Sequence, residues 1–395
     1  MKALSDLRVL ELGQLLAGPF ASYMLAGFGA EVIKVEPPGS GDPMRSWRKV
    51  HEGTSLWWYS LGRNKKCITL DLRKPEGVRI LKQLAAQCDV LIENFRPGRM
   101  EEWGLGYDEL ARDNPKLVMV RISGWGQTGP YAERPGFASV AEGVGGLRHI
   151  VGDPDRPPVR TGLSIGDSLA GLHAVIGTLT ALHHRERTGR GQVVDTAIYE
   201  SVFNMMESML PEFDKLGFVR ERSGARLPGI VPSNTYRCAD GKYVIIGGNG
   251  DSIFQRLMQA VGRPELASDP RLATNPGRVQ HEPEIDQAIE AFTSAHPYAD
   301  VERALMAADV PVGPIYSVAD IASDPQYLAR QMFDRVRLPD GSSLQVPAYV
   351  PKLSLTPAAT EWAGPSLGEH NHAVYCGLLG MSETQLAELV NSRVI

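Results

Sequence analysis

The sequence predicts an α/β protein with a large domain built on a parallel sheet and a smaller α+β domain. In its first half, short apolar runs alternate with helix-length segments, which is the pattern of βαβ units. Farther along, hairpin signatures replace that alternation. A chain of 395 residues also exceeds what one small core needs, so two packed units are expected.

The first half supplies the expected parallel sheet and the helices on its two faces. A proline at the first turn is typical of the helix that should begin at Gly18-Pro19. The expected strands cover residues 7–12, 31–36, 67–72, 89–95, 116–122 and 192–198, with further helices over 74–88, 101–112, 168–184 and up to about 210.

The second half has a different sequence pattern. Residues 234–246 alternate around the turn Ala239-Asp240-Gly241, and residues 334–346 alternate around Pro339-Asp340-Gly341, so both segments should be hairpins. Helices are expected over 253–261, 284–294 and 300–308. We therefore expect the large domain in 1–210, a linker in 211–225, the small domain in 226–330, and a linker and C-terminal part returning to the large domain in 331–395.

Composition excludes several classes of protein. The 41 Lys and Arg residues face 46 Asp and Glu residues, a net charge of -5, which argues against nucleic-acid binding. Residues 12–30 carry no charge but contain Gln14, Pro19 and several glycines, so we expect neither a signal peptide nor a membrane span. The four cysteines are far apart, which indicates a reducing, cytoplasmic location.

Two familiar kinds of site are not expected. The turn after the first strand lacks the G-x-G-x-x-G pattern of nicotinamide enzymes, although another nucleotide could bind where the strands end. His183 and His184 are neighbours on their helix, and no H-E-x-x-H occurs, so no metal site is predicted.

Two positions each allow a structural and a functional interpretation. Asp167, between Gly166 and a small-residue helix, could be a helix N-cap or a covalent nucleophile on an activated acyl group. The run Gly247-Gly248-Asn249-Gly250 follows a strand. It could be a flexible turn or a mobile loop that shields a reactive intermediate from water.

Ten short motifs occur together in one order. They are LAGP at 16–19, GAEVIKVE at 29–36, GSGD at 39–42, NKK at 64–66, LDL at 70–72, ENFRPG at 93–98, SGWGQTGP at 123–130, GDS at 166–168, GRGQVVD at 189–195 and LGEH at 367–370. With them, the chain resembles the class III CoA-transferases, the family of formyl-CoA transferase and carnitine CoA-transferase. Residues 136–148 and 202–208 look most similar to members that use succinyl-CoA and small dicarboxylates.

The resemblance implies a large Rossmann-like domain built from both chain ends, a small domain, and a homodimer of interlinked, ring-shaped protomers. It implies Asp167 as the nucleophile and Gly247 and Gly248 in the covering loop. The substrates would be an acyl-CoA and small carboxylic acids or analogues such as a sulfinate, with no tightly bound cofactor. By position, CoA contacts would involve Gln14, Leu15, Leu70, Arg73, Asn94, Phe95 and Arg96.

Some residues depart from relatives of this fold. Phe137 stands where the acyl-CoA racemases have a histidine base, and phenylalanine carries no proton, so racemase is the weaker alternative. Leu16 replaces a glutamine and Pro37 an arginine of the oxalate-specific branch, which argues against oxalate and against one CoA contact. A binder of CoA without catalysis is a third hypothesis, opposed by the presence of Gly166-Asp167 and the glycine loop.

A distal carboxylate of the acceptor would need a cationic partner. Arginine is the natural choice because it can bind both carboxylate oxygens. The candidates are Arg45, Arg148 and Arg226.

Overall fold

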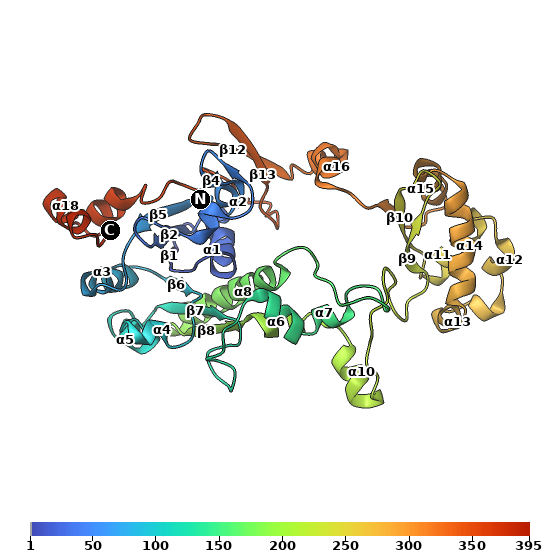
Figure 1. Ribbon diagram of the computed structural model, residues 1–395, viewed down its shortest axis with the longest axis horizontal. Coiled ribbons are helices and arrows are strands. Elements are labelled where there is room, and N and C mark those ends of the chain that lie inside the picture. The colour runs from blue at the N-terminus through green and yellow to red at the C-terminus, as the bar shows by residue number, and fades with distance from the viewer. Residues whose placement is uncertain (1) are drawn as a thin grey trace. The chain divides into compact units, whose positions relative to one another are not determined.

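The computed structural model describes residues 2–395 and divides into two compact units (Figure 1). The larger unit contains the chain up to Leu147, Thr161–Leu216 and Gln326–Ile395, and the smaller contains Arg148–Arg160 and Gly217–Pro325. The larger unit is thus assembled from three separate stretches of sequence.

Six parallel strands form the sheet of the larger unit, in the order β5-β2-β1-β6-β7-β8. They are β1 (Arg8–Glu11), β2 (Glu31–Glu36), β5 (Lys65–Thr69), β6 (Val90–Glu93), β7 (Val118–Ser123) and β8 (Val193–Ala197). This is the order of a doubly wound dinucleotide-binding sheet. The chain changes direction across the sheet between β1 and β6, and ligands of such folds bind at the carboxyl ends of the strands there.

Alternating side chains give the sheet two apolar faces. Leu10 and Ile33 pack in a core with α3 (Pro75–Ala85) and α5 (Tyr107–Asp113). Val9 and Val32 pack in the opposite core, with α1 (Ala17–Gly27), α6 (Ala138–Val144) and α8 (Ile165–Thr188). Helices therefore cover both faces, as the sequence predicts for a parallel sheet.

The C-terminal segment packs against the edge of this sheet. The hydroxyl of Tyr375, in the π-helix Ala373–Leu378, donates to the Thr69 carbonyl at 2.6 Å. The Asp71 amide donates to the carbonyl of Val394, after α18 (Glu383–Asn391), at 2.8 Å. The hairpin of β12 (Phe333–Arg337) and β13 (Ser343–Pro347) also belongs to this unit.

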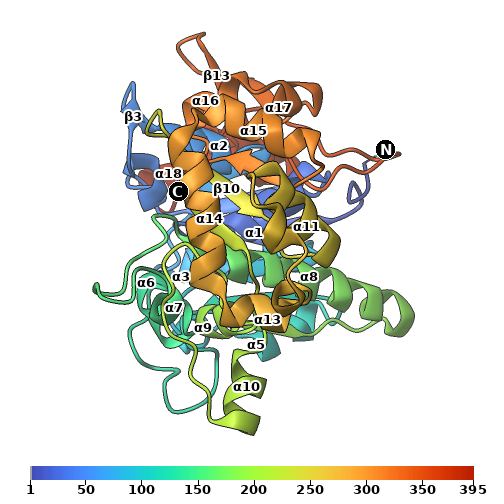
Figure 2. The same ribbon diagram turned by 90° about the vertical axis from the view of Figure 1, so that its right-hand side faces the viewer.

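The smaller unit has its own antiparallel sheet and its own core. The strand order is β11-β10-β9, with β9 (Ser233–Arg237), β10 (Tyr243–Gly247) and β11 (Val312–Pro314). Figure 2 shows α11 (Asp251–Ala260), α14 (Glu282–Ala295) and α15 (Tyr298–Ala307) of this unit around β10. Phe254, Ile285 and Leu305 lie in its core.

The remaining elements are short. They are 3-10 helices at Pro43–Ser46 and Pro270–Leu272, β3 (Val50–His51), β4 (Thr54–Ser55), α2 (Leu56–Leu61), α4 (Arg99–Glu102), α7 (Leu147–Ile150), α9 (Ile198–Phe203), α10 (Met209–Leu216), α12 (Pro264–Ala267), α13 (Asn275–Gln280), α16 (Val318–Ser323) and α17 (Pro325–Ala329).

Three expected elements differ from the structure. The helix expected over 101–112 is two helices, α4 and α5, because Gly104 adopts a left-handed φ of 67° between them. The helix expected to reach residue 210 ends with α9, and Glu207, at φ 47°, precedes the separate helix α10. The first expected hairpin gains a third strand, β11, which was not predicted.

Helix α8 is the one described helix that is long and apolar enough to cross a membrane, by length and composition alone. Core helices of globular proteins pass the same test. Ala170, Ala174 and Ala181 of this helix are buried against the sheet, so we assign it to the core of the larger unit.

Candidate functional site

The loop between β1 and α1 lies at the point where the strand order reverses. Gly13 and Gly18 approach each other so closely in it that a Cβ on Gly13 would lie 3.2 Å from the Gly18 Cα. Leu15 has a φ of 61°, in the left-handed region that leucine rarely adopts. Both features turn the chain sharply at the carboxyl end of β1.

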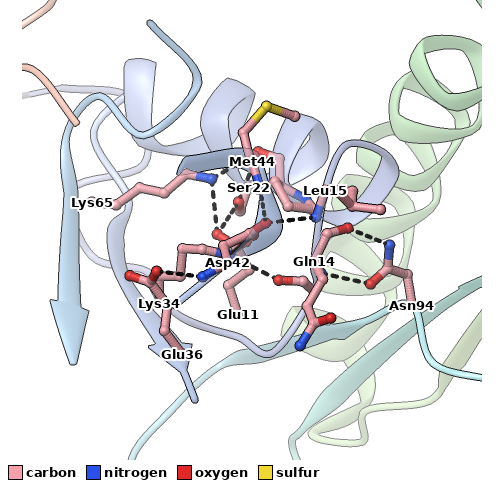
Figure 3. Close-up of polar contacts among 12 residues, drawn as sticks. Glu11, Gln14, Leu15, Ser22, Lys34, Glu36, Asp42, Met44, Lys65 and Asn94 are labelled. Atoms are coloured by element: carbon pink, nitrogen blue, oxygen red, sulfur yellow. Dashed lines mark hydrogen bonds and ion pairs between the residues drawn. The ribbon is translucent and has the colours of Figure 1, made fainter. Parts of the chain in front are cut away.

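Asn94 binds this loop from the end of β6. The Gln14 amide donates to Asn94 Oδ1 at 2.8 Å, and Asn94 Nδ2 donates to the Gln14 carbonyl at 2.8 Å (Figure 3). The structure thus brings together two residues that the resemblance assigned to CoA binding. Asn94 positions Gln14 through its main chain and leaves the Gln14 side chain available to line a cavity.

A cavity of about 340 Å³ lies at the carboxyl ends of β1, β2, β5 and β6. Its walls are mostly apolar, and Phe95 and Trp103 meet in it edge to face at 5.2 Å. The lining residues are Leu12, Gln14, Val35, Glu36, Pro37, Pro38, Ser40, Leu70, Asp71, Leu72, Arg73, Phe95 and Trp103. The set contains four predicted CoA contacts: Gln14, Leu70, Arg73 and Phe95.

Two arginine side chains lie at the margin of the cavity. The exposed Arg73 guanidinium binds both oxygens of Asp71, at 2.8 and 3.0 Å, and this hydrogen bonding lowers the pKa of Asp71. Arg96 is also exposed, directly after Phe95. Apolar walls suit a flat heteroaromatic ring, and exposed arginines suit phosphate groups, so the residues present fit the nucleotide part of CoA.

A buried ionic network lies next to the cavity, centred on the carboxylate of Glu11 (Figure 3). Lys34 Nζ lies 2.8 Å from Glu11 Oε1, and Lys65 Nζ lies 2.9 Å from Glu11 Oε2. The Ser22 hydroxyl donates to Oε2 at 2.6 Å. Register explains the first pair, because Glu11 of β1 is directly opposite Lys34 of β2.

Burial and charge act against each other in this network. Burial alone would raise the pKa of Glu11, but Lys34 and Lys65 together outweigh it and lower that pKa to about 2. Burial opposes the charge of Lys34 too, and Asp42 and Glu11 raise the pKa of Lys34 in spite of it. Glu11 and Lys34 are therefore ionised at neutral pH.

The network continues through Asp42 into the loop after β2. Asp42 Oδ2 lies 2.9 Å from Lys34 Nζ, and the Asp42 amide donates to Glu36 Oε2 at 2.9 Å. Arg45 binds both oxygens of Glu36 at 2.7 Å and donates to the Pro365 carbonyl at 3.0 Å. All three nitrogens of this guanidinium are engaged, so we do not expect Arg45 to bind a substrate carboxylate.

Asp167 lies in the first turn of α8, where Ser164 and not Asp167 occupies the N-cap position. Gly166 beside it is buried, and its amide donates to the buried Glu142 carboxylate at 3.3 Å. A Cβ on Gly166 would lie 3.1 Å from both Glu142 and Ile198, which explains the glycine. Asp167 does not line the cavity described above.

The predicted covering loop lies in the smaller unit. Gly247 ends β10, and its amide donates to the Pro311 carbonyl at 3.0 Å. The Gly248 amide donates to the Pro232 carbonyl at 2.9 Å. A side chain on Gly248 would collide with Leu257, so close packing requires glycine there.

The other residues singled out from the sequence are spread over the chain. Phe137 is the N-cap residue of α6 and is 67% exposed, whereas Leu16 is buried and Pro37 lines the cavity. Arg148 and Arg226 belong to the smaller unit, where Arg226 lies 3.5 Å from Glu282.

One group of side chains in the described part of the chain could hold a metal ion. His372, Cys376 and Glu383 have ligand atoms within 4.8 Å of one another. His372 and Glu383 are exposed and already paired at 2.6 Å. The sequence analysis did not predict this group.

The buried network was also missed. Its signal was visible, because Lys34 and Glu36 interrupt a strand that should be buried on both faces. Charges at such positions indicate buried partners. Those partners, Glu11 and Asp42 for Lys34 and Arg45 for Glu36, come from other segments.

Comparison with known proteins identifies the family. Residues 4–371 match the family model "CoA-transferase family III". The chain is 52% identical, over 100% of its length and 98% of the relative, to succinyl-CoA–D-citramalate CoA-transferase of Chloroflexus aurantiacus. It is 41% identical, over 99% of its length and 98% of the relative, to the beta subunit of succinyl-CoA–L-malate CoA-transferase of that organism.

A solved structure has the same architecture. The crystal structure of a CAIB/BAIF family protein from Brucella suis superposes with a TM-score of 0.84 at 35% identity, covering 95% of this chain and 99% of that one. The family model and the full-length similarity to known transferases lead to the same conclusion: the chain is an enzyme that belongs to CoA-transferase family III.

Proposed function

We propose that this enzyme transfers CoA from succinyl-CoA to a small dicarboxylic acid or an analogous acid such as a sulfinate. The observation that carries the proposal is the full-length similarity to transferases named for succinyl-CoA, with citramalate at 52% identity, malate at 41% and glutarate, in Mus musculus, at 34%. Those named acceptors share a second carboxylate. The acceptor of this chain should share it too.

Asp167 is the proposed nucleophile. Its carboxylate oxygen attacks the thioester carbonyl of succinyl-CoA, the C–S bond breaks, and CoA leaves as the thiolate with an aspartyl–succinyl anhydride remaining. The thiolate then attacks the aspartyl carbonyl of that anhydride, which forms an aspartyl–CoA thioester and releases succinate.

The acceptor completes the exchange by the reverse steps. Its carboxylate attacks the aspartyl–CoA thioester, releases CoA thiolate and forms a second anhydride with Asp167. The thiolate attacks the acceptor's carbonyl, which yields the new acyl-CoA and regenerates the Asp167 carboxylate. One thioester replaces another, so the cycle consumes no ATP.

The remaining predicted residues bind or shield the substrate. Leu70, Arg73 and Phe95 line the cavity that we assign to the nucleotide part of CoA, and Arg96 follows Phe95 at its margin. Gly247 and Gly248 belong to the loop proposed to exclude water from the anhydrides, since water would hydrolyse them.

We also propose that the enzyme is a homodimer of interlinked protomers. Helix α8 exposes Leu172, Ile176 and Leu179, with Ile176 62% exposed. Val140 and Val144 of α6 are exposed as well. Apolar side chains grouped on neighbouring helices favour a covered surface.

A thioester scan tests the function. Purified enzyme is incubated with succinyl-CoA and a mixture of small mono- and dicarboxylic acids, without ATP, and new acyl-CoA species are identified by mass spectrometry. We expect a new thioester with a dicarboxylate. Asp167→Asn keeps the size of the side chain but removes the nucleophile, so its transfer rate should fall at least about 10³-fold. Full activity in Asp167→Asn would refute the mechanism.

A separate deuterium-exchange experiment tests the racemase alternative. A racemase would exchange the α-proton of an acyl-CoA with deuterated water when no acceptor acid is present. Because Phe137 cannot act as a base, we expect no such exchange. If succinyl-CoA is not consumed with any acid, the proposed donor is wrong.

A further inference from the structure

The loop that carries Gln14 is strained, and hydrogen bonds from other segments hold it in place. Leu15 holds a φ of 61°, which costs free energy for a leucine. Four main-chain groups around it have partners: Gly13 O accepts from Lys34 Nζ at 2.8 Å, the Gln14 amide and carbonyl are bound by Asn94, and the Leu15 amide donates to Asp42 Oδ1 at 3.0 Å. These bonds hold the turn in a conformation that its own sequence disfavours.

Asp42 and Lys34 provide two of these bonds and are also bound to each other. Lys34 Nζ donates to Glu11 Oε1 and to the Gly13 carbonyl, both at 2.8 Å, and forms an ion pair with Asp42 Oδ2 at 2.9 Å. Asp42 Oδ1 also accepts the Met44 amide at 2.8 Å. Both side chains are 0–1% exposed, and neither lines the cavity.

The pair joins two walls of the cavity. On one side it fixes the loop of Gln14, and on the other it fixes the loop of Pro37, Pro38 and Ser40, because the Asp42 amide is bound to Glu36. Glu36 is in turn bound by Arg45 through both oxygens. A displacement of Asp42 would therefore move both walls.

We propose that Lys34 and Asp42 are positioning residues that preorganise the cavity for CoA. They act through the main chain of Gly13 and Leu15 and through the loop after β2, without touching the substrate. The inference rests on the proposed function, because it takes the cavity's ligand to be the nucleotide part of CoA. A network that served stability alone would not change affinity in a variant that stays folded.

The test compares two charge-removing substitutions in and around β2. Asp42→Asn keeps the size of the side chain but removes its attraction for Lys34. Glu31→Gln is the matched control, because Glu31 begins β2 and pairs with Arg8 and Lys66 at 2.6 and 2.5 Å, away from the cavity. Calorimetry gives the Kd for free CoA, thermal unfolding gives Tm, and steady-state assays give kcat and KM for the acyl-CoA.

We expect Asp42→Asn to raise the Kd for CoA and the KM at least about tenfold, with kcat at saturation within about twofold of the unsubstituted enzyme. Glu31→Gln should leave the Kd within about twofold. A folded Asp42→Asn variant that binds CoA as the unsubstituted enzyme does would overturn the inference. Failure of the unsubstituted enzyme to bind CoA would instead refute the assignment of the cavity.

Hydrogen exchange on the unsubstituted enzyme decides the case in which Asp42→Asn does not fold. Preorganisation predicts that the amides of Gln14 and Leu15 are protected before CoA is added and gain little when it binds. Rapid exchange of these amides in the CoA-free enzyme, with protection only after binding, would contradict a preformed turn.

Discussion

Glu11 shows how a buried carboxylate retains its charge inside a parallel sheet. Neither of its oxygens reaches solvent. Two lysines balance its charge, and a serine hydroxyl donates a hydrogen bond to it. A buried ion pair gains little net free energy, but loss of one partner leaves an uncompensated charge. Stability should therefore depend on the protonation of this one group.

The stability of the enzyme at acidic pH should depend on the ionisation of Glu11. Its pKa is about 2 in the folded chain and 4.5 ordinarily, so its ionised form stabilises the fold by about 3 kcal/mol. Because the folded pKa is the lower one, this contribution is complete above pH 4.5 and is lost as the pH falls toward 2. Urea unfolding between pH 7 and pH 3 measures the free energy of unfolding of the unsubstituted enzyme and of Glu11→Gln. The difference between the two free energies should become smaller as the pH falls. A difference independent of pH would contradict this account.

Single residues also mark the limit of prediction from sequence. Gln14 and Asn94 were both predicted as CoA contacts, but their mutual bonds depend on two strands 80 residues apart becoming neighbours. Lys34 and Glu36 were visible as charges in an apolar strand, whereas their partners were not identifiable from local pattern. Long-range pairing is a property of the fold and leaves no periodic signal.

Among the elements, α8 combines two unlike faces. Its alanines pack on the sheet, while Leu172, Ile176 and Leu179 recur at spacings of four and three residues and are exposed. That spacing places them on one stripe of the helix. The sequence predicted a helix over 168–184, but its apolar composition did not indicate that one stripe would be exposed.

A charge on this stripe should destabilise the dimer. We expect Ile176→Arg to lower Tm and to raise the fraction of monomer measured by light scattering after unfolding and refolding, because a buried arginine without a partner destabilises an interface. Refolding is required because interlinked protomers cannot come apart while both are folded. Gln83→Arg adds the same charge to an exposed position of α3, on the other face of the sheet, and should leave both quantities unchanged. A dimer that re-forms in Ile176→Arg as fully as in the unsubstituted enzyme would exclude this stripe as its interface.

The division into two units gives each unit hydrophobic cores of its own. Phe254, Ile285 and Leu305 lie in a core confined to the smaller unit, whereas the sheet of β1 and β2 has its own cores on both faces. Alternating strands and hairpin turns predicted both architectures well, because both patterns are local. The grouping of Arg148–Arg160 with the smaller unit has no such local signal.

Separate cores should respond separately to damage. Phe254→Ala leaves a cavity in the smaller unit and should destabilise it by about 3–5 kcal/mol. Hydrogen exchange should then speed up for the amides of β9, β10 and β11, while those of β1 and β2 keep their protection. Equal loss of protection in both sets would show that the units unfold as one.

The anchoring of Asp71 by Val394 and of Thr69 by Tyr375 also bears on how the enzyme is synthesised. The ribosome delivers β5 early and its C-terminal partners more than 300 residues later, so a nascent chain waits with one edge of the sheet and one core face uncovered. Such intermediates are substrates for chaperones. A chain released prematurely keeps that surface exposed and remains open to proteolysis, so the wall of the cavity at the strand ends is completed only when translation has reached the final helix.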